Sequence, residues 1–206
     1  MRANTIRLPI LFGLAAVTTA TGACVSASQY SETATERDSL AIVAAEREAQ
    51  LAELQASYDN LTNLFEEEIA ARELEIKQLV DGVQVEIPSD VMFASGASSA
   101  QVGEEGQAFA IKLAEYLKGT DFFISVVGHT DNQQPRGTLA QSYPTNWELA
   151  AARAANAVRF LEAQGIDPTR MVAVSRGEFD PIATNDTPEG RAMNRRIQVI
   201  LRSLPE

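Results

Sequence analysis

The longest run without proline or glycine is the feature that most constrains how this chain folds. It includes all of Asp38–Val80, a stretch that consists mostly of Ala, Leu, Glu, Gln and Arg, which have high helix propensity. Apolar residues recur in it at alternating spacings of three and four, a short heptad seam. The seam consists of Leu51, Leu54, Tyr58, Leu61 and Phe65. Since one helix cannot bury such a stripe alone, we expect a helical or coiled-coil spacer over residues 38–81, roughly 65 Å long. It would fold back on itself or form a homo-oligomer through residues 38–80.

A second pattern follows the spacer. Val83, Val85 and Ile87 alternate with polar residues, as in a half-buried strand. Further strands are expected at Phe122–Val127, Met171–Val174 and Arg195–Leu201, and helices at Gly103–Lys118 and Trp147–Gln164, the latter capped by Asn146. The order β-α-β-α-β-β predicts an α+β sandwich in which two helices cover one face of a sheet.

Composition excludes several classes of function. The formal net charge of −11 argues against general affinity for nucleic acid, because neutralising phosphates needs an excess of Lys and Arg. His129 is the only histidine and Cys24 the only cysteine, whereas zinc sites usually need three or four such ligands. We therefore expect no metal site, no cofactor and no catalysis. His129 is expected to be a structural hydrogen-bonding residue.

The first residues have the pattern of an export signal. Arg2 and Arg7 precede an apolar segment, Leu8–Val17, which is too short to span a bilayer comfortably. Small residues follow it, and then Cys24. We expect residues 1–23 to be a signal peptide and residues 24–37, which are polar and rich in Ser and Thr, to be a flexible tether.

The strongest candidates for a binding site are two residues of opposite charge. Asp131 follows an apolar strand, and Arg153 lies in the helix that comes next. A carboxylate and a planar guanidinium fork held at fixed separation could bind a zwitterion. On the residues alone, the two side chains could equally pair with each other.

Three segments extend this reading: Gly128–Asn132, Tyr143–Leu149 and Asn185–Arg196. In this order they resemble the OmpA-like peptidoglycan-binding domain, which also occurs in Pal lipoproteins and MotB proteins. The resemblance covers residues 83–201 and implies that the domain occupies residues 82–206. It implies non-catalytic binding of the peptidoglycan peptide stem, with Asp131 taking the ammonium and Arg153 the carboxylate of diaminopimelate. Secondary ligand-binding candidates are Thr130, Asn146, Leu149 and Arg196.

A second resemblance concerns membrane attachment. Thr21-Gly22-Ala23-Cys24 is similar to the lipobox of bacterial lipoproteins, which implies that Cys24 is acylated, for example with palmitate. Val25 after the cysteine implies the outer membrane, with the chain facing the periplasm. Ordinary signal cleavage nearby, which would leave a free thiol, is the alternative. The competing functions are a motor or transport component of the MotB type, and a wall hydrolase that uses His129 and Asp131.

Overall fold

The computed structural model describes residues 27–94 and 100–203. The expected signal peptide and Cys24 lie outside the described residues. The chain divides into two compact units, Met1–Ala44 and Ala45–Glu206. The described part of the first unit belongs to helix α1 (Ala27–Leu64). The side chains of residues 30–44 in this helix are almost all exposed. Within the described residues, no helix is both long enough and apolar enough to span a bilayer.

Helix α1 begins earlier than the sequence indicated, so the flexible tether expected over residues 24–37 is wrong from Ala27 onward. Hydroxyl groups explain how a stretch rich in Ser and Thr stays helical. Thr33 Oγ1 donates to the Tyr30 carbonyl at 3.0 Å, and Thr35 Oγ1 donates to the Ser31 carbonyl at 2.8 Å. These bonds to the preceding turn satisfy the hydroxyls without breaking the helix.

The helical spacer expected as far as residue 81 is also wrong in its last third. Helix α1 ends at Leu64 and is followed by the short helix α2 (Glu66–Ala70) and strand β1 (Glu75–Gln78). Arg72, at φ 63°, lies in the left-handed region between them. Tertiary packing outweighs helix propensity here, because β1 pairs antiparallel with the next strand and buries Ile76.

A five-stranded sheet forms the centre of the second unit. Its strands are β1, β2 (Gly82–Pro88), β3 (Phe123–His129), β4 (Met171–Gly177) and β5 (Arg196–Arg202), in the spatial order β1-β2-β5-β3-β4. The β3–β4 pair is parallel and the other pairs are antiparallel. Short elements connect them: α3 (Ser89–Met92), α5 (Thr138–Ser142), the 3-10 helix η2 (Pro168–Arg170) and α7 (Pro188–Asn194).

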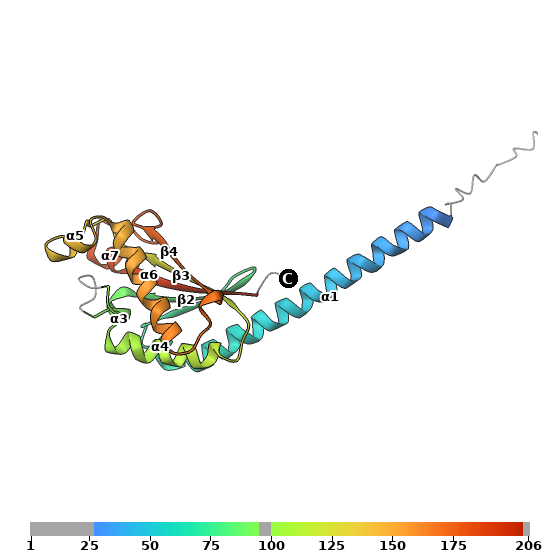
Figure 1. Ribbon diagram of the computed structural model, residues 1–206, viewed down its shortest axis with the longest axis horizontal. Helices are drawn as coiled ribbons and strands as arrows, with labels where there is room; N and C mark the ends of the chain where they lie inside the picture. The colour runs from blue at the N-terminus through green and yellow to red at the C-terminus, as the bar shows by residue number, and fades with distance from the viewer. Residues whose placement is uncertain (1–26, 95–99, 204–206) are drawn as a thin grey trace, which may run out of the picture. The chain divides into compact units, whose positions relative to one another are not determined.

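The helices α4 (Glu104–Leu117) and α6 (Asn146–Ala163) cover one face of this sheet (Figure 1). The core consists of their apolar stripes and of alternate residues of the three central strands, such as Val85, Val126 and Val199. These strand residues all point to the same face, as the period of two requires. The expected α+β class is confirmed, and the expected strands and helices follow one another in the predicted order, with the unexpected strand β1 before them.

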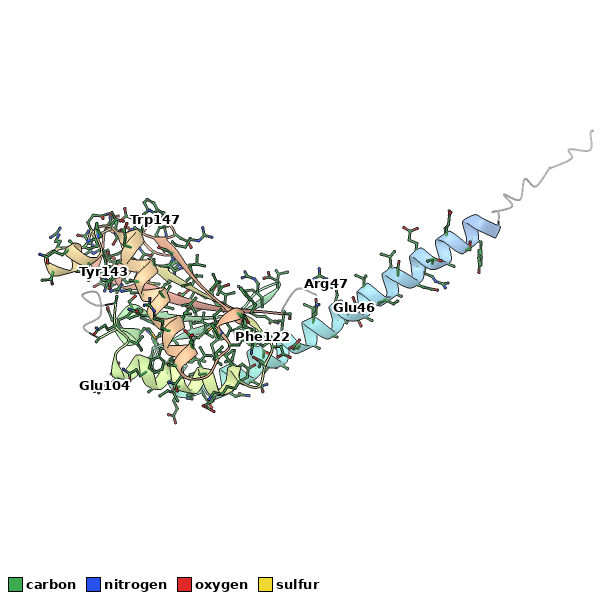
Figure 2. All side chains as sticks on the ribbon, viewed as in Figure 1. Glu46, Arg47, Glu104, Phe122, Tyr143 and Trp147 are labelled. Atoms are coloured by element: carbon green, nitrogen blue, oxygen red, sulfur yellow. The ribbon has the colours of Figure 1, made fainter. Side chains whose placement is uncertain are left out.

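The apolar seam of α1 belongs to the same core. Leu54, Leu61 and Phe65 are 4%, 0% and 0% exposed, and the rings of Phe65 and Phe109 lie 4.8 Å apart between centroids. The seam therefore has a partner within the chain and needs no second chain, because α4 and the sheet cover it. Leu51, 54% exposed, is the seam residue left outside. Glu46 and Arg47 project from the same helix into solvent (Figure 2).

Strand β2 is buried on both faces rather than half-buried. Gln84 and Glu86 are 9% and 8% exposed. Gln198 Nε2 on β5 donates to Glu86 Oε2 at 2.9 Å, and Gln84 Nε2 donates to the same oxygen at 3.2 Å. A polar strand face can be buried when its groups find hydrogen-bond partners.

One glycine brings helix α6 close to the sheet. A Cβ atom on Gly128 would lie 2.2 Å from the carbonyl oxygen of Ala150. Because the side chain is a hydrogen, the first turns of α6 pack directly on the end of β3. The residues that follow β3 and the inner face of α6 thus meet at one place.

Candidate functional site

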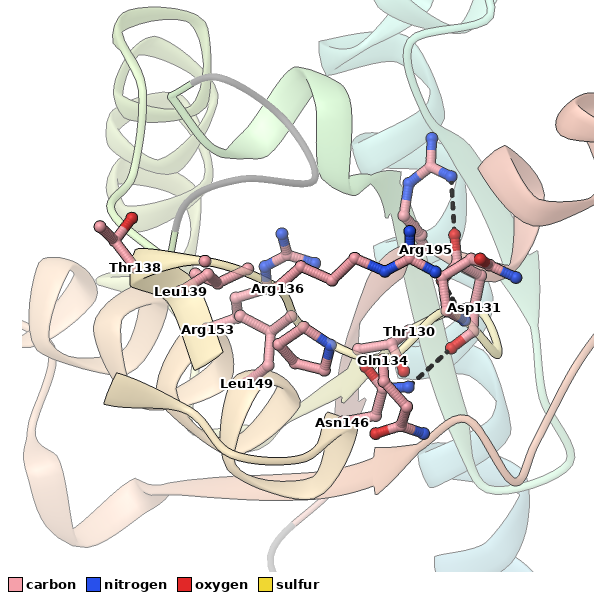
Figure 3. Close-up of a pocket in the computed structure, with 13 residues that line it drawn as sticks. Thr130, Asp131, Gln134, Arg136, Thr138, Leu139, Asn146, Leu149, Arg153 and Arg195 are labelled. Carbon is pink, nitrogen blue, oxygen red and sulfur yellow. Dashed lines mark hydrogen bonds and ion pairs between the residues drawn. The ribbon is translucent and has the colours of Figure 1, made fainter. Parts of the chain in front are cut away.

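A cavity of about 520 Å³ lies where β3 ends against α6 (Figure 3). Four parts of the chain line it: the residues just after β3, the loop that follows with the start of α5, the inner face of α6, and the residue before β5. The lining residues are Thr130, Asp131, Gln133, Gln134, Pro135, Arg136, Gly137, Thr138, Leu139, Asn146, Leu149, Arg153 and Arg195. The structure therefore brings together five of the six predicted ligand-binding residues.

Asp131 is held in position by two hydrogen-bond donors. The Gln133 backbone N–H donates to Oδ1 at 2.9 Å, closing a turn typical of aspartate. The Arg195 guanidinium donates from Nη1 to Oδ2 at 2.9 Å. Each carboxylate oxygen has two lone pairs, so Asp131 can still accept from a ligand.

The cap of helix α6 differs from the prediction. Thr145, not Asn146, is the N-cap: its hydroxyl accepts from the Trp147 N–H at 3.2 Å, and the Glu148 carboxylate accepts from the Thr145 N–H at 2.9 Å. This is a capping box. The hydrogen bond to Thr145 lowers the pKa of Glu148.

Asn146 is the first residue of the helix and is 2% exposed. Its Nδ2 donates to the Asp131 carbonyl oxygen at 3.2 Å and to the Glu178 carboxylate. Asn146 therefore connects the helix, the Asp131 loop and the end of β4, which gives it a positioning role in the cavity wall.

Arg153 is fully buried at the floor of the cavity. Its guanidinium carbon lies 5.1 Å from the centre of the Phe93 ring, within cation–π range. Burial, and then the charge of Arg195, lower the pKa of Arg153 to about 10, while Asp90 and Asp131 act in the opposite direction. The group stays protonated at neutral pH.

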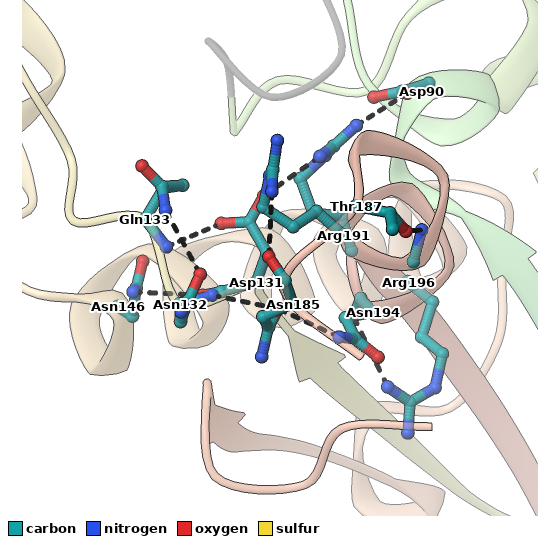
Figure 4. Close-up of polar contacts among 12 residues, drawn as sticks. Asp90, Asp131, Asn132, Gln133, Asn146, Asn185, Thr187, Arg191, Asn194 and Arg196 are labelled. Atoms are coloured by element: carbon teal, nitrogen blue, oxygen red, sulfur yellow. Dashed lines mark hydrogen bonds and ion pairs between the residues drawn. The ribbon is translucent and has the colours of Figure 1, made fainter. Parts of the chain in front are cut away.

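Arg195 is the functional candidate that sequence reasoning passed over in favour of Arg196. It bridges the carboxylates of Asp90 and Asp131, which are labelled in Figure 4, donating from Nη1 to Asp131 and from Nη2 to Asp90 Oδ2 at 3.1 Å. Burial opposes its charge, but the bonds to Asp131 and Asp90 outweigh it and raise the pKa of Arg195. Asn194, 0% exposed, anchors this segment by accepting from the Ile182 and Ala183 N–H groups.

Arg196 lies elsewhere. It lines a separate cavity beside β1 and β2, with Nε 3.4 Å from Glu86 Oε2 and both terminal nitrogens donating to the Asp180 carbonyl at 3.2 Å. The period of two could have indicated this. Ile197, Val199 and Leu201 face the helices, so Arg196 must face the other side of the sheet.

His129 has the structural role that was expected. It is 1% exposed, and its Nε2 lies 3.0 Å from Gln198 Oε1. Burial and the nearby Arg196 charge lower the pKa of His129 to about 4, so the ring is neutral at physiological pH. Within residues 27–94 and 100–203, no cluster of three or more His, Cys, Asp or Glu side chains could hold a metal ion.

The charges on the cavity wall are unequal. Arg136, Arg153 and Arg195 provide three guanidinium groups, and Asp131 provides one carboxylate. A cavity of this size falls in the range that accommodates ligands of small-peptide size. The arrangement can bind a ligand that carries one cationic group and at least one anionic group.

Comparison with known proteins identifies the family of this chain. Residues 92–195 match the OmpA family, and the chain belongs to that family. It is 33% identical over 131 residues to Motility protein B of Bacillus subtilis, covering 63% of this chain and 48% of the relative. It is 35% identical over 91 residues to the Peptidoglycan-binding protein ArfA of Mycobacterium tuberculosis, covering 44% of this chain and 26% of the relative. The chain thus spans about half the length of the first of these relatives.

A solved structure extends the comparison to the fold. The cell wall anchor of the T6SS from Pseudomonas aeruginosa superposes with a TM-score of 0.63 at 35% sequence identity. The match covers 70% of this chain and 97% of that chain. The match therefore includes nearly the whole fold of that cell wall anchor.

Proposed function

We propose that this chain binds peptidoglycan without catalysis, through the free end of meso-diaminopimelate in the peptide stem. The observation that carries the proposal is the position of Asp131 and Arg153 on the wall of one cavity. The free end of diaminopimelate carries an ammonium and a carboxylate on one carbon. Asp131 would accept from the ammonium, and Arg153 would donate to the carboxylate in the two-point geometry of a guanidinium.

The environment of each group supports these roles. Asp131 is already fixed by Gln133 and Arg195, so little side-chain freedom is lost when the ammonium binds. Arg153 has given up its hydration on burial, so a carboxylate that reaches it meets a guanidinium with little competition from water. Arg195, one residue before β5, would stabilise the bound carboxylate as a second cation.

Membership of the OmpA family supports the choice of ligand. ArfA is described as peptidoglycan-binding, and the Pseudomonas aeruginosa structure is that of a cell wall anchor. We propose the same ligand for this chain, and a role in tethering the outer membrane to the cell wall. Acylated Cys24 would supply the membrane attachment. A stable anchor needs more than one acyl chain, so we propose that Cys24 carries more than one.

A pull-down with purified diaminopimelate-type sacculi tests the binding role. Asp131→Ala and Arg153→Ala should each abolish sedimentation with sacculi. Asp121→Ala and Arg159→Ala change exposed residues of the same types and should sediment like the parent. Thermal denaturation of each variant separates a lost site from a lost fold. Parental sedimentation of both site variants would exclude this cavity as the binding site.

A motor component of the MotB type is the second candidate, because B. subtilis Motility protein B is a relative. Mass spectrometry of the mature N-terminus distinguishes the two. An acylated Cys24 as first residue supports the tether, whereas a retained segment 1–23 supports the motor component.

Self-association, expected through residues 38–80, now needs a different surface. Since Leu54, Leu61 and Phe65 lie in the domain core, association through α1 would have to use its exposed apolar residues in this range, which are Leu40, Ile42, Val43 and Leu51. Light scattering on the Leu40→Ser/Leu51→Ser double variant tests this. A parent that is monomeric at high concentration would exclude oligomers through α1.

A further inference from the structure

Arg136 on the cavity wall has a charge that the diaminopimelate end does not match. Among the lining residues, Asp131 carries the one negative charge, whereas Arg153 and Arg195 carry two positive charges. A zwitterion adds one charge of each sign and leaves this positive excess unchanged. Arg136, exposed on the same wall, adds a positive charge beyond it (Figure 3). A ligand with one more carboxylate would be complementary to the whole cavity.

The backbone on both sides of Arg136 is restricted. Pro135 has a fixed φ, and Gly137 has φ +60°, a conformation that residues with side chains rarely adopt. Gln134 Nε2 donates to Glu178 Oε2 at 2.9 Å, which ties the loop to the end of β4; Glu178 itself is not a lining residue. The loop therefore presents Arg136 from a defined backbone, which reduces the entropy lost on binding.

The peptide stem can offer a second carboxylate. When the residue before diaminopimelate is a γ-linked glutamate, its α-carboxylate stays free. In an extended stem this group lies roughly 10 Å from the free end of diaminopimelate, a distance set by one residue of chain plus a long side chain. In many cell walls the same position is amidated, which removes the charge but keeps the shape.

We infer that Arg136 binds this second carboxylate and makes the site selective for stems whose γ-linked glutamate is not amidated. The inference rests on the proposed function, because it assumes that diaminopimelate occupies the Asp131 and Arg153 end of the cavity. Arg136 would act as a specificity-determining residue on the rim. Asp131 and Arg153 would still supply the contacts that every diaminopimelate stem shares.

The test compares two synthetic tripeptides by calorimetry on the full chain at low ionic strength. One is L-Ala-γ-D-Glu-meso-diaminopimelate, and the other carries the α-amide on its glutamate. The parent should bind the acid about three- to fivefold more tightly, the size of an exposed ion pair. Arg136→Gln should bind both peptides equally, and Arg136→Lys should keep part of the preference. Arg47→Gln removes the same charge from an exposed residue of helix α1 and should discriminate like the parent.

The outcomes separate this inference from the function on which it rests. Equal affinity of the parent for both peptides would overturn the role of Arg136 and leave diaminopimelate binding intact. Undiminished discrimination by Arg136→Gln would do the same. Binding of neither peptide by the parent would overturn the proposed function and this inference together.

Discussion

Replacing the diaminopimelate carboxylate is the sharpest test of the role proposed for Arg153. A Lys-type stem keeps the side-chain ammonium but lacks the neighbouring carboxylate. Asp131 would still bind its partner, whereas Arg153 would face a cavity without an anion. A diaminopimelate stem amidated at that carboxylate should behave like the Lys-type stem, because the amide removes the charge but keeps the shape.

The size of the effect follows from the burial of Arg153. Burial is the main cause that lowers its pKa to about 10, which corresponds to about 3 kcal/mol against its charged form. A bound carboxylate can offset only part of this, so we expect the acid to contribute about 1–3 kcal/mol. Affinity for the Lys-type or amidated stem should then be roughly tenfold to a hundredfold weaker.

Calorimetric titration of the full chain with the three stems measures these differences directly. Arg153→Lys should weaken binding of the diaminopimelate stem toward the level of the Lys-type stem, because an ammonium cannot reproduce the two-point geometry. Arg159→Lys makes the same change at an exposed residue of helix α6 and should leave affinity unchanged. Equal affinity of the parent for all three stems would show that Arg153 is not the carboxylate receptor.

Three further predictions concern the anchor, the core and the buried histidine. Cys24→Ser should move the protein from membranes to the soluble periplasmic fraction; unchanged fractionation would contradict acylation. Leu61→Ala, at a residue with 0% exposure, should lower the free energy of unfolding by about 2–5 kcal/mol. Leu51→Ala, at 54% exposure, should change it by less than about 0.5 kcal/mol, and equal effects would place the seam outside the core. His129 has a folded-state pKa of about 4, so the unfolded chain binds the extra proton between pH 6.5 and 4. The stabilisation from neutral His129 should be fully present above pH 6.5, and the free energy of unfolding should fall by up to about 3 kcal/mol as the pH is lowered toward 4. In His129→Gln, the free energy of unfolding measured by denaturation should depend less on pH.

The sequence by itself determined the elements whose pattern is local. The alternation in β2 and β5, the apolar run of β3 and the amphipathic helix α4 all appear close to where they were expected. The close succession of a strand, Asp131 and a helix bearing Arg153 indicated that the two residues lie near each other, and both line one cavity. In each case the period of side chains along the backbone carries the information.

The tertiary structure decided what depends on residues distant along the chain. Residues 75–78 have helix-forming neighbours, yet they form β1 because the edge of β2 offers hydrogen bonds. The α1 seam could have met a second chain, but Phe109 and the sheet lie within reach of Phe65 and Leu61. A local sequence pattern shows that an apolar stripe exists, but it does not show against which surface the stripe packs.

The same reason explains the change from Arg196 to Arg195 at the site. The two side chains are neighbours in sequence, and either could pair with a carboxylate. The register of β5 against β2 turns Arg196 toward Glu86, while Arg195, before the strand, bridges Asp90 and Asp131. Strand pairing across the sheet therefore decides which of the two arginines enters the cavity. Only that pairing brings Arg195 to the carboxylate of Asp131, 64 positions away in the sequence.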